Sequence, residues 1–497
     1  MNKIIADFLN KFNSLNKYFV VVIILLVGFT SIHLNGNEEQ YMGLAKSFMD
    51  PDWMPQSLTF HEFPGTRILY QIIVGTVLKF LSFNSTLLIL RILLVAVISI
   101  PLAKLYRQLE IDNIHVFFQL AGLYLVNQSL FAGSFIFISV EPKCFSYVFI
   151  FWAIYFFLKN KPGASTASLI LATYFHFLVG FFVAFYLFAS LSYYVFKKET
   201  PLRGYIKNVL FYLLAIIPVV VYLTGAVASK ENFAFPSSDW IYTYFRSPNH
   251  TALFLSPSYF HKEHFYGILW TLIGLIFAIL FLKDTQKSIS NRVTVFTIVT
   301  IIGTVMFLPF IFFDREGVIL KYYLFRINAV STFFLSVIIV RAYLDFTNIG
   351  WIKRMRIVIF MISFLGLIKI SIPNAVLNYR ILFETNNDLI SCTNYLRDHT
   401  PTSSIVMSFI DDLRISRLSQ RDRLAVYKFV PADFSKIQDW YSRLQYRDSV
   451  LQHPEQLLDE NKYGVDYCLT EHSLGKEFPD PVFSSGNYFI YEIPEMN

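Results

Sequence analysis

Long apolar runs separated by short polar segments occupy most of the chain before Pro373. A bilayer core about 30 Å thick requires about 20 mostly apolar residues in a helix that crosses it. By this measure the pattern predicts about eleven crossings, the first at Tyr18–His33 and the last at Ile357–Ile372. The run Ile68–Phe83 is short and favours a place in the outer interface, with a true crossing as the alternative. The predicted fold is therefore mainly α, a polytopic bundle of transmembrane helices.

Basic residues set the orientation of these spans. Lys and Arg gather at the cytoplasmic ends of membrane helices, and the basic runs of this chain alternate regularly with its apolar runs. The N-terminal segment is also basic, and no small-x-small cleavage site follows its apolar run, which indicates an uncleaved first span. The N-terminus is accordingly predicted to be cytoplasmic, and the residues after about Asn374 extracytoplasmic.

The chain changes character after Pro373. Residues 374–497 are polar and alternate like a globular domain, so they are predicted to form a small extracytoplasmic α/β domain, and residues 1–373 the transmembrane domain. Ser485-Gly486-Asn487 is a hairpin-turn signal between the last two strands. The predicted helices are Asn386–Arg397, Pro431–Asp448 and Pro454–Asn461, and the predicted strands are Ile405–Phe409, Leu424–Phe429, Val465–Leu469, Val482–Ser484 and Tyr488–Ile493.

Composition agrees with a membrane protein and removes several other classes. The chain has 497 residues, of which 55% are hydrophobic and 15% charged, whereas soluble domains have about 25% charged residues. Its formal charge of +7 follows from basic residues at cytoplasmic helix ends, so no nucleic-acid partner is predicted. Three cysteines exclude a disulfide scaffold and a thiolate metal cluster. A disulfide between Cys392 and Cys468 is permitted outside the cytoplasm, but two buried free thiols are favoured.

Polar residues that played no part in setting the orientation fall on its external side. The first external loop is residues 34–67, and another long one is residues 230–265. Charged groups at membrane depth are expensive and usually face a bundle interior or a water-filled cavity. The candidate site residues are Glu38, Glu39, Asp52, His61, His176, Arg246, His250, Lys321 and Arg326. We therefore expect the first loop to share one cavity with Arg246 and His250.

Most candidates also have an ordinary structural explanation. His176 in an aromatic hairpin is commonly an interfacial packing residue, and Arg326 in an apolar helix commonly snorkels. Glu141 precedes Pro142 and suits a helix N-terminus. The Arg-x-Pro-x-His segment Arg246–His250 is harder to explain in this way. It holds a guanidinium near an imidazole, and arginine binds phosphate in a bidentate manner.

With these residues in place, the layout resembles the GT-C superfamily of polytopic membrane glycosyltransferases. The matching features are the acidic stretch Asn37–Tyr41 after the first span, Arg91, the basic end Lys104–Arg107 and the stretch Tyr395–Pro401 that opens the external domain. The chain is also similar to a bacterial membrane family of unknown function that shares this fold. The resemblance implies transfer of a sugar from a polyprenyl-phosphate donor, at the outer leaflet of a bacterial inner or plasma membrane, to a glycan, lipid or protein acceptor.

The resemblance also implies roles for the site residues. An acidic base activates the acceptor hydroxyl, and cations stabilise the leaving phosphate. Glu39 is preferred to Glu38 as the base, because on a helix Glu39 shares a face with Gly43, whose small size would leave room for a ligand. The expected substrate and phosphate ligands are Arg246, His250, Arg326, Lys321, His61, His176 and Asp52.

No cofactor is firmly predicted, and two other functions stay open. Asp50-Pro51-Asp52 is the nearest approach to an Asp-x-Asp pair, and its proline is atypical, so a divalent cation is neither required nor excluded. The predicted partners are membrane lipids and the lipid-linked sugar donor; the sequence names no protein partner. A transporter or flippase of a lipid-linked or anionic substrate would show broken helices at mid-membrane. A non-catalytic membrane partner protein would use the external domain for docking.

Overall fold

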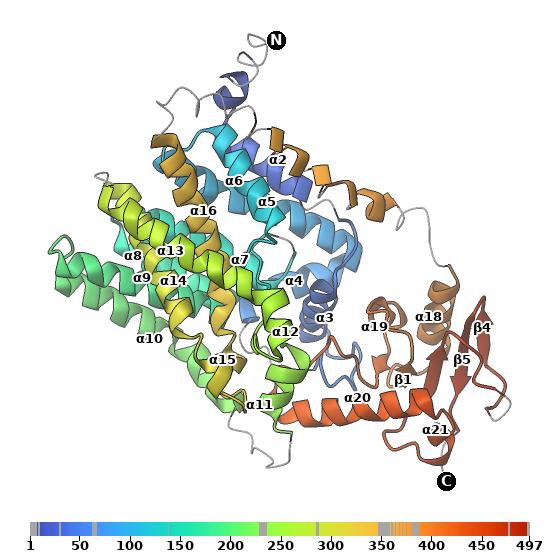
Figure 1. Cartoon of the computed structure of the whole chain (residues 1–497). Helices are drawn as coiled ribbons and strands as arrows, with labels where there is room; N and C mark the ends of the chain where they lie inside the picture. Colours follow the sequence, from blue (N-terminus) through green and yellow to red (C-terminus); the bar gives the residue numbers. More distant parts are fainter. Residues whose placement is uncertain are drawn as a thin grey trace. The chain divides into compact units, whose positions relative to one another are not determined.

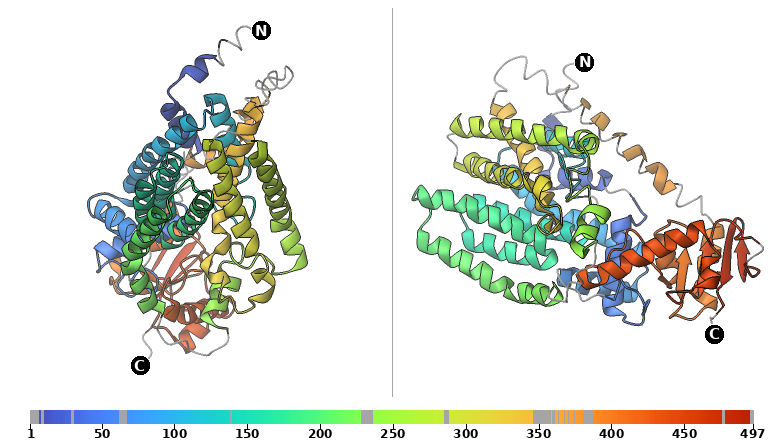
Figure 2. Two further views of the ribbon diagram at one scale, coloured as in Figure 1. Left: turned by 90° about the vertical axis from the view of Figure 1, so that its left-hand side faces the viewer. Right: turned by 60° about the horizontal axis from the view of Figure 1, so that its bottom comes forward.

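The computed structural model describes residues 7, 10–28, 31–61, 67–137, 139–227, 236–284, 288–345, 387–475 and 478–494, with scattered positions between 358 and 379. The chain divides into two compact units, which are described separately. Unit 1 comprises Met1–Ile32, Leu87–Val221 and Ser247–Asn378, and unit 2 comprises His33–Thr86, Tyr222–Arg246 and Tyr379–Asn497. Figures 1 and 2 show their elements coloured by position in the chain.

Unit 1 is built from apolar helices. Its main helices are α2 (Lys17–Gly28), α5 (Phe83–Gln108), α6 (Asn113–Leu125), α7 (Pro142–Leu158), α8 (Pro162–Phe175), α9 (Phe177–Phe196), α10 (Leu202–Val227), α13 (Tyr266–Asp284), α14 (Ser288–Met306) and α16 (Asn328–Asp345). Helices α5 and α10 each extend at one end into unit 2. Short turns of helix, α12 (Pro257–Phe260), η3 (His261–Phe265), α15 (Phe310–Phe313), η4 (Leu320–Tyr322) and η5 (Leu324–Ile327), connect them. Helices α8, α9 and α10 lie side by side in both figures, and the hydroxyls of Thr173 in α8 and Tyr212 in α10 are 2.8 Å apart.

The described chain contains six helical stretches that are long and apolar enough to cross a membrane. They are Phe83–Gln108, Phe177–Phe196, Leu202–Leu223, Pro257–Phe281, Asn291–Phe313 and Leu320–Leu344. Fewer spans are found than the sequence predicts, because α2, α6, α7 and α8, which lie at predicted crossings, are shorter than 18 residues. The expected last span, Ile357–Ile372, is described only at scattered positions, which are helical, so its length as a continuous helix lies outside the described residues. The hairpin predicted around His176 is confirmed, since α8 ends at Phe175 and α9 begins at Phe177.

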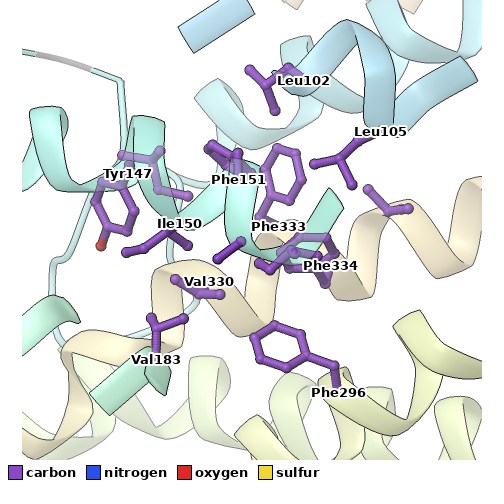
Figure 3. Close-up of a cluster of buried hydrophobic side chains, with 14 of the residues drawn as sticks. Leu102, Leu105, Tyr147, Ile150, Phe151, Val183, Phe296, Val330, Phe333 and Phe334 are labelled. Carbon is purple, nitrogen blue, oxygen red and sulfur yellow. The ribbon is translucent and has the colours of Figure 1, made fainter. Parts of the chain in front are cut away.

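Aromatic side chains form the centre of unit 1 (Figure 3). Phe151 of α7 lies against Phe333 of α16, with ring centroids 4.9 Å apart, and Phe296 of α14 meets Phe334 edge to face. Fully burying a side chain of this size contributes about 1.5–3 kcal/mol. Large interlocking rings on facing helices therefore hold α7, α14 and α16 in one arrangement.

Two stretches of unit 1 leave the helical pattern close to the candidate site residues. Between α6 and α7 the backbone is irregular, and the amide oxygen of buried Gln128 accepts hydrogen bonds from the N–H groups of Ile136 and Phe137, both at 2.9 Å. Asn328 does the same for Leu130, at 2.9 Å. Such side-chain partners are needed wherever non-helical backbone is buried among apolar helices.

The second irregular stretch corrects the predicted position of Arg326. The sequence places Arg326 inside an apolar α-helix, but it lies in the 3-10 segment η5, before α16 begins at Asn328. Tyr323 separates η4 from η5 with a left-handed backbone, at φ 54°. A left-handed residue interrupts a right-handed helix, so Arg326 lies in a constrained turn, where its side chain has less freedom to snorkel.

Unit 2 contains a five-stranded sheet with the order β2-β1-β3-β5-β4. Its strands are β1 (Ile405–Ser408), β2 (Asp422–Arg423), β3 (Tyr467–Thr470), β4 (Phe483–Ser485) and β5 (Tyr488–Glu492). Strand β1 pairs in parallel with β2 and β3, whereas β5 is antiparallel to β3 and β4. The predicted hairpin turn is confirmed, because Ser485 pairs with Tyr488 and Gly486 is left-handed at φ 57°.

The structure contains the helices that the sequence predicts after Pro373, but it lacks one of the predicted strands. The helices are α3 (Gly36–Met49), α4 (Ile68–Phe80), α11 (Ser238–Trp240), η2 (Ile241–Arg246), α18 (Asn387–His399), α19 (Arg414–Ser419), η6 (Phe434–Lys436), α20 (Ile437–Gln452) and α21 (Gln456–Asp459). The predicted strand Leu424–Phe429 is wrong, because only Asp422–Arg423 pair with β1. Val426 and Phe429 instead pack with Trp53 and Phe60 of the first loop.

The first loop belongs to the same compact unit as the sheet, although the sequence assigns it to the transmembrane domain. The hydroxyl of Thr59 donates to the carbonyl of Phe429 at 2.6 Å, and the amide of Gln40 donates to that of Val430 at 3.2 Å. Cys392 and Cys468 are both buried and free, in two different hydrophobic clusters of this unit. Contacts distant in sequence thus build unit 2 from three parts of the chain.

Candidate functional site

Tyr323 is the centre of a polar cluster inside unit 1. Its left-handed backbone places the ring beneath Arg326, whose guanidinium carbon is 4.1 Å from the ring centroid. The Tyr323 hydroxyl donates to Ser247 Oγ at 2.9 Å, and the ring of His250 lies 5.9 Å from that of Tyr323. His250 is oriented by Ala132, since its Nδ1 is 2.9 Å from the Ala132 carbonyl oxygen. The structure therefore brings Arg326 and His250 to one tyrosine.

His176 joins this cluster from the turn between α8 and α9. The N–H of Val179 lies 3.4 Å from Nδ1 of His176, and Arg326 NH1 lies 3.2 Å from its Nε2. A neutral imidazole has one acceptor nitrogen and one N–H. Both ring nitrogens of His176 face an N–H group, but only one of them can accept a hydrogen bond. In the other contact the N–H of the ring therefore faces a second N–H donor. An anionic oxygen placed beside Arg326 and the ring N–H would accept from both.

The start of α7 adds an ion pair to the cluster. Lys143 and Glu141 are both buried, with Nζ 3.6 Å from Oε2, and Ser139 donates to the Glu141 carboxylate. Lys143 Nζ also lies 3.3 Å from the centroid of the Phe135 ring. Lys143 is close enough to Arg326 for the two cations to repel each other. We call Glu141, Lys143, Tyr147, His176, His250, Tyr323 and Arg326 the Arg326 cluster.

A small cavity adjoins the Arg326 cluster. It has about 180 Å³ of empty space and is lined by Tyr147, Val179, Phe182, Arg326, Ile327 and Val330. Its walls are apolar except for the Tyr147 hydroxyl and the Arg326 guanidinium. An apolar wall lowers the local dielectric and strengthens the attraction between Arg326 and an anion. In this conformation the cavity has room for about one water molecule, so it would have to widen to admit a phosphate group.

The preferred catalytic residue, Glu39, lies in unit 2 and is held by an arginine. Both of its carboxylate oxygens accept from Arg417 of α19, with Nε to Oε2 and NH2 to Oε1 each at 3.0 Å. The Glu39 side chain is only 2% exposed. Burial raises the pKa of Glu39 above its ordinary value, although Arg417 pulls the pKa in the opposite direction. Glu39 is therefore a buried carboxylate with a bidentate partner.

Glu38 performs a different local task. Asn35 caps α3 by accepting from the N–H groups of Asn37 and Glu38, and the Glu38 carboxylate accepts from the Asn35 N–H at 2.9 Å. This reciprocal capping box satisfies N–H groups that a helix start otherwise leaves unpaired. The reason for preferring Glu39 is corrected, because a Cβ at Gly43 would lie 2.5 Å from the Phe60 ring. Gly43 admits that ring rather than a ligand.

The remaining sequence candidates make other contacts, and Arg246, His61 and Asp52 belong to unit 2. Arg246 ends η2 in unit 2, donates to the Lys428 carbonyl at 2.8 Å and lies 5.3 Å from the Tyr427 ring centroid. His61 Nε2 is 3.0 Å from the Trp53 carbonyl oxygen. Asp52 is exposed, and Lys321 lies over Tyr322 at 5.4 Å. The expected shared cavity of the first loop with Arg246 and His250 stays a prediction, since it involves both units.

Sequence reasoning missed three residues that organise these sites. Tyr323 gives no signal except its place three residues before Arg326, and Lys143 appears only as a second charge after Glu141. Arg417 lies 378 residues from Glu39, in the short helix α19, which was not predicted from the sequence. In the part of the chain that the structure describes, no group of three or more His, Cys, Asp or Glu side chains is arranged to hold a metal ion.

No known family model matches the chain, and no curated protein matches its sequence significantly. The geometry of the two units is therefore the basis for assigning a function.

Proposed function

We propose that this chain is an integral membrane glycosyltransferase of the GT-C type, which transfers a sugar from a polyprenyl-phosphate donor to a glycan, lipid or protein acceptor. In this proposal the N-terminus is cytoplasmic, the sheet of unit 2 is extracytoplasmic, and the membrane is a bacterial inner or plasma membrane. The observation that supports the proposal is the Arg326 cluster, in which buried Lys143 and His176 and half-buried Arg326 lie near a small cavity in a unit of apolar helices.

The charges of the Arg326 cluster favour an anionic ligand. Glu141 offsets Lys143, which leaves Arg326 without a carboxylate in contact among the described residues. Arg326 NH1 lies 3.2 Å from Nε2 of His176, and in the tautomer that carries its proton on Nε2 both groups would donate to a phosphate oxygen bound beside them. Preorganised cations and N–H donors of this kind stabilise the charge that develops on a leaving phosphate. Arg326, His176 and Lys143 are therefore assigned to the donor phosphate, and His250 orients Tyr323.

Glu39 is the proposed base, and its pairing with Arg417 adds a condition to this role. A carboxylate with a raised pKa is better matched to proton transfer near neutral pH than an ordinary one. Arg417 opposes this, because an ion-paired carboxylate accepts a proton less readily. The proposed reaction therefore includes a state in which Arg417 has moved from Glu39 and the acceptor hydroxyl has taken its place.

The test is sugar transfer by the purified chain in lipid nanodiscs with a polyprenyl-phosphate-linked sugar. Arg326→Gln is expected to lower the rate by about 10²–10³-fold, the usual effect of removing one stabilising donor. Arg315→Gln is the matched control, because Arg315 is exposed and outside the cluster. Glu39→Gln is expected to cost about 10²–10⁴-fold. Unchanged transfer in Arg326→Gln would remove the cluster from the mechanism.

A transporter or flippase is the second candidate, and the irregular segments of unit 1 favour it. Helical order is interrupted between α6 and α7, just before Glu141, and again from η4 to η5, which holds Tyr323 and Arg326. Broken helices that expose backbone to a substrate are typical of secondary transporters. Movement of a fluorescent polyprenyl phosphate across proteoliposomes, without any transfer product, would support this function and contradict the transferase.

A further inference from the structure

Helix α4 of unit 2 has two apolar faces, and only one of them is covered by protein. Tyr70, Gln71, Val74, Gly75 and Leu78 are buried. Residues on the opposite side are exposed although they are large and apolar: Ile72 by 43%, Ile73 by 40%, Phe80 by 80%, and Leu81, directly after the helix, by 39%. We call Ile72, Ile73, Phe80 and Leu81 the α4 face.

The covered face is a close helix–helix contact with α3. A Cβ at Gly75 would lie 2.3 Å from the Ala45 carbonyl oxygen, so only glycine permits this approach. The amide of Gln71 reaches the Leu44 carbonyl at 3.4 Å, and Arg67 lies 5.0 Å from the Tyr41 ring centroid. Helices α3 and α4 are therefore packed as one rigid pair, and the α4 face is the outer side of that pair.

The polar groups on and beside the α4 face are compatible with an apolar environment. The hydroxyl of Thr76, which lies among these residues, donates to the Ile72 carbonyl of its own helix at 2.6 Å. Lys79 is exposed at the edge of the face, where its long chain can carry the ammonium group to lipid headgroups. Apolar side chains bordered by a basic one are typical of helices that lie in the membrane interface.

Helix length and chain connectivity identify the occupant. A helix of 13 residues is about 20 Å long, too short for a hydrocarbon core about 30 Å thick. The candidate span α5 begins at Phe83, so the end of α4 at Phe80 lies within about 10 Å of its first residue. The C-terminal end of α4 therefore lies close to the membrane boundary if α5 crosses the bilayer, and the exposed apolar residues along α4 favour an orientation in that boundary.

We propose that the α4 face lies in the headgroup–acyl boundary of the bilayer, so that α4 is an interfacial helix that fixes the depth of α3 and of Glu39. This inference rests on the membrane location in the proposed function. An interfacial helix buries its apolar side by about 5–10 Å. Because α3 is packed rigidly on α4, the depth of α4 sets the height of the first-loop carboxylates above the lipid.

The test measures the surroundings of a nitroxide label on the full chain in lipid nanodiscs. Cysteine is introduced at Phe80 or, as a second position on the same face, at Ile72; the natural Cys144, Cys392 and Cys468 are buried. Collisions with oxygen report lipid, and collisions with a nickel chelate report water. Ser442→Cys on α20 is the water reference, because Ser442 is exposed in the same unit, and Ile92→Cys on α5 is the lipid reference.

Labels at Phe80 and Ile72 are expected to resemble Ile92→Cys, with an oxygen-to-nickel ratio several-fold above that of Ser442→Cys. A ratio equal to that of Ser442→Cys would overturn the inference. Protection from both reagents would also overturn it, because the face would then be covered by protein, such as a second copy of the chain. If Ile92→Cys itself is exposed to nickel, the membrane location fails first, which distinguishes that failure from an error about α4 alone.

Discussion

The buried charges of the two units are balanced in different ways. In unit 2 both oxygens of Glu39 accept from Arg417, so that one acid and one base satisfy each other in a bidentate pair. In unit 1 the cations of the Arg326 cluster exceed its carboxylates, since Glu141 is matched by Lys143 while Arg326 faces an imidazole and a tyrosine ring. A cavity adjoins the unbalanced group.

This difference separates a charge that is already paired within the protein from a group of cations whose pairing within the protein is incomplete. A buried charge costs several kcal/mol unless it is paired. Glu39 and Arg417 meet this cost within the protein and tie α3 to α19. In the Arg326 cluster, buried Lys143 is paired with Glu141, whereas half-buried Arg326 contacts no carboxylate among the described residues; the proposed anionic ligand would pair with it. Variants that remove one partner of the Glu39–Arg417 pair, or that change the net charge of the Arg326 cluster, therefore test the comparison.

The largest effect is expected from breaking the pair in unit 2. Arg417→Gln leaves the Glu39 carboxylate buried without its partner, and unit 2 is expected to lose about 3–5 kcal/mol of stability. Thermal unfolding of the purified chain, followed by tryptophan fluorescence, measures the loss. The loss should be smaller at pH 5 than at pH 8, because burial raises the pKa of Glu39 and protonation removes the charge.

Arg414→Gln is the control for this prediction. Arg414 pairs with Asp412 at 2.6 Å, but its side chain is 43% exposed. Exposed pairs contribute about 0–1 kcal/mol, so this variant should remain close to the natural chain. Equal losses in Arg417→Gln and Arg414→Gln would show that burial of the Glu39 pair has no special importance.

A second buried carboxylate of unit 2 lacks an arginine in contact, and its effect should depend on pH. Asp422 accepts from the Gln56 N–H at 2.7 Å, and burial raises its pKa to about 7, above the ordinary 3.8. The native state therefore keeps the proton, and its contribution to stability is present below about pH 4 and is lost as pH rises through about 7. Between these two pH values the free energy of unfolding is expected to fall by up to about 4 kcal/mol.

Asp422→Asn should remove this pH dependence and should be more stable than the natural chain above pH 7, because an amide keeps the acceptor without the charge. Unfolding midpoints recorded from pH 4 to pH 8 measure the difference between the two chains. Parallel curves for Asp422→Asn and the natural chain would contradict the assignment of the raised pKa to Asp422.

A smaller effect is expected on the affinity of unit 1 for a polyprenyl phosphate. Variants at Lys143 and Glu141 should change this affinity in opposite directions. Lys143→Met removes a cation from the Arg326 cluster and should weaken binding of a polyprenyl phosphate by about tenfold, or about 1.4 kcal/mol. Glu141→Gln removes the carboxylate and should strengthen binding by a similar factor. Titration calorimetry in nanodiscs measures both. A change in the same direction for both variants would show that packing, not charge, controls this group.

The sequence predicted part of the Arg326 cluster for a clear reason. Arg326, His176 and His250 are polar groups in or beside apolar runs, and such groups are rarely placed without a partner. The hairpin at His176 could be found because two apolar runs meet at one polar residue. Residue order could not reveal that Tyr323 adopts a left-handed backbone, since this conformation depends on the packing of η4 and η5 in the folded chain.

The same contrast holds in unit 2. Helix α18, strand β5 and the turn at Gly486 were predictable because their signals are local in the chain. The strand Leu424–Phe429 was predicted wrongly, because its apolar pattern suits a strand but its side chains are used to pack against the first loop. Local patterns report burial, and they do not report which distant element covers the buried side.

By itself the sequence determined that this chain is mainly helical, that several of its helices are long and apolar enough to cross a membrane, and that a small sheet follows them. These properties arise from local runs of side chains and from their free energy of transfer from water. Only the tertiary structure decided that Arg417 holds Glu39 and that Tyr323 joins Arg326 to His250. The partners in these contacts come from distant parts of the chain, and only folding brings their charges within a few ångströms.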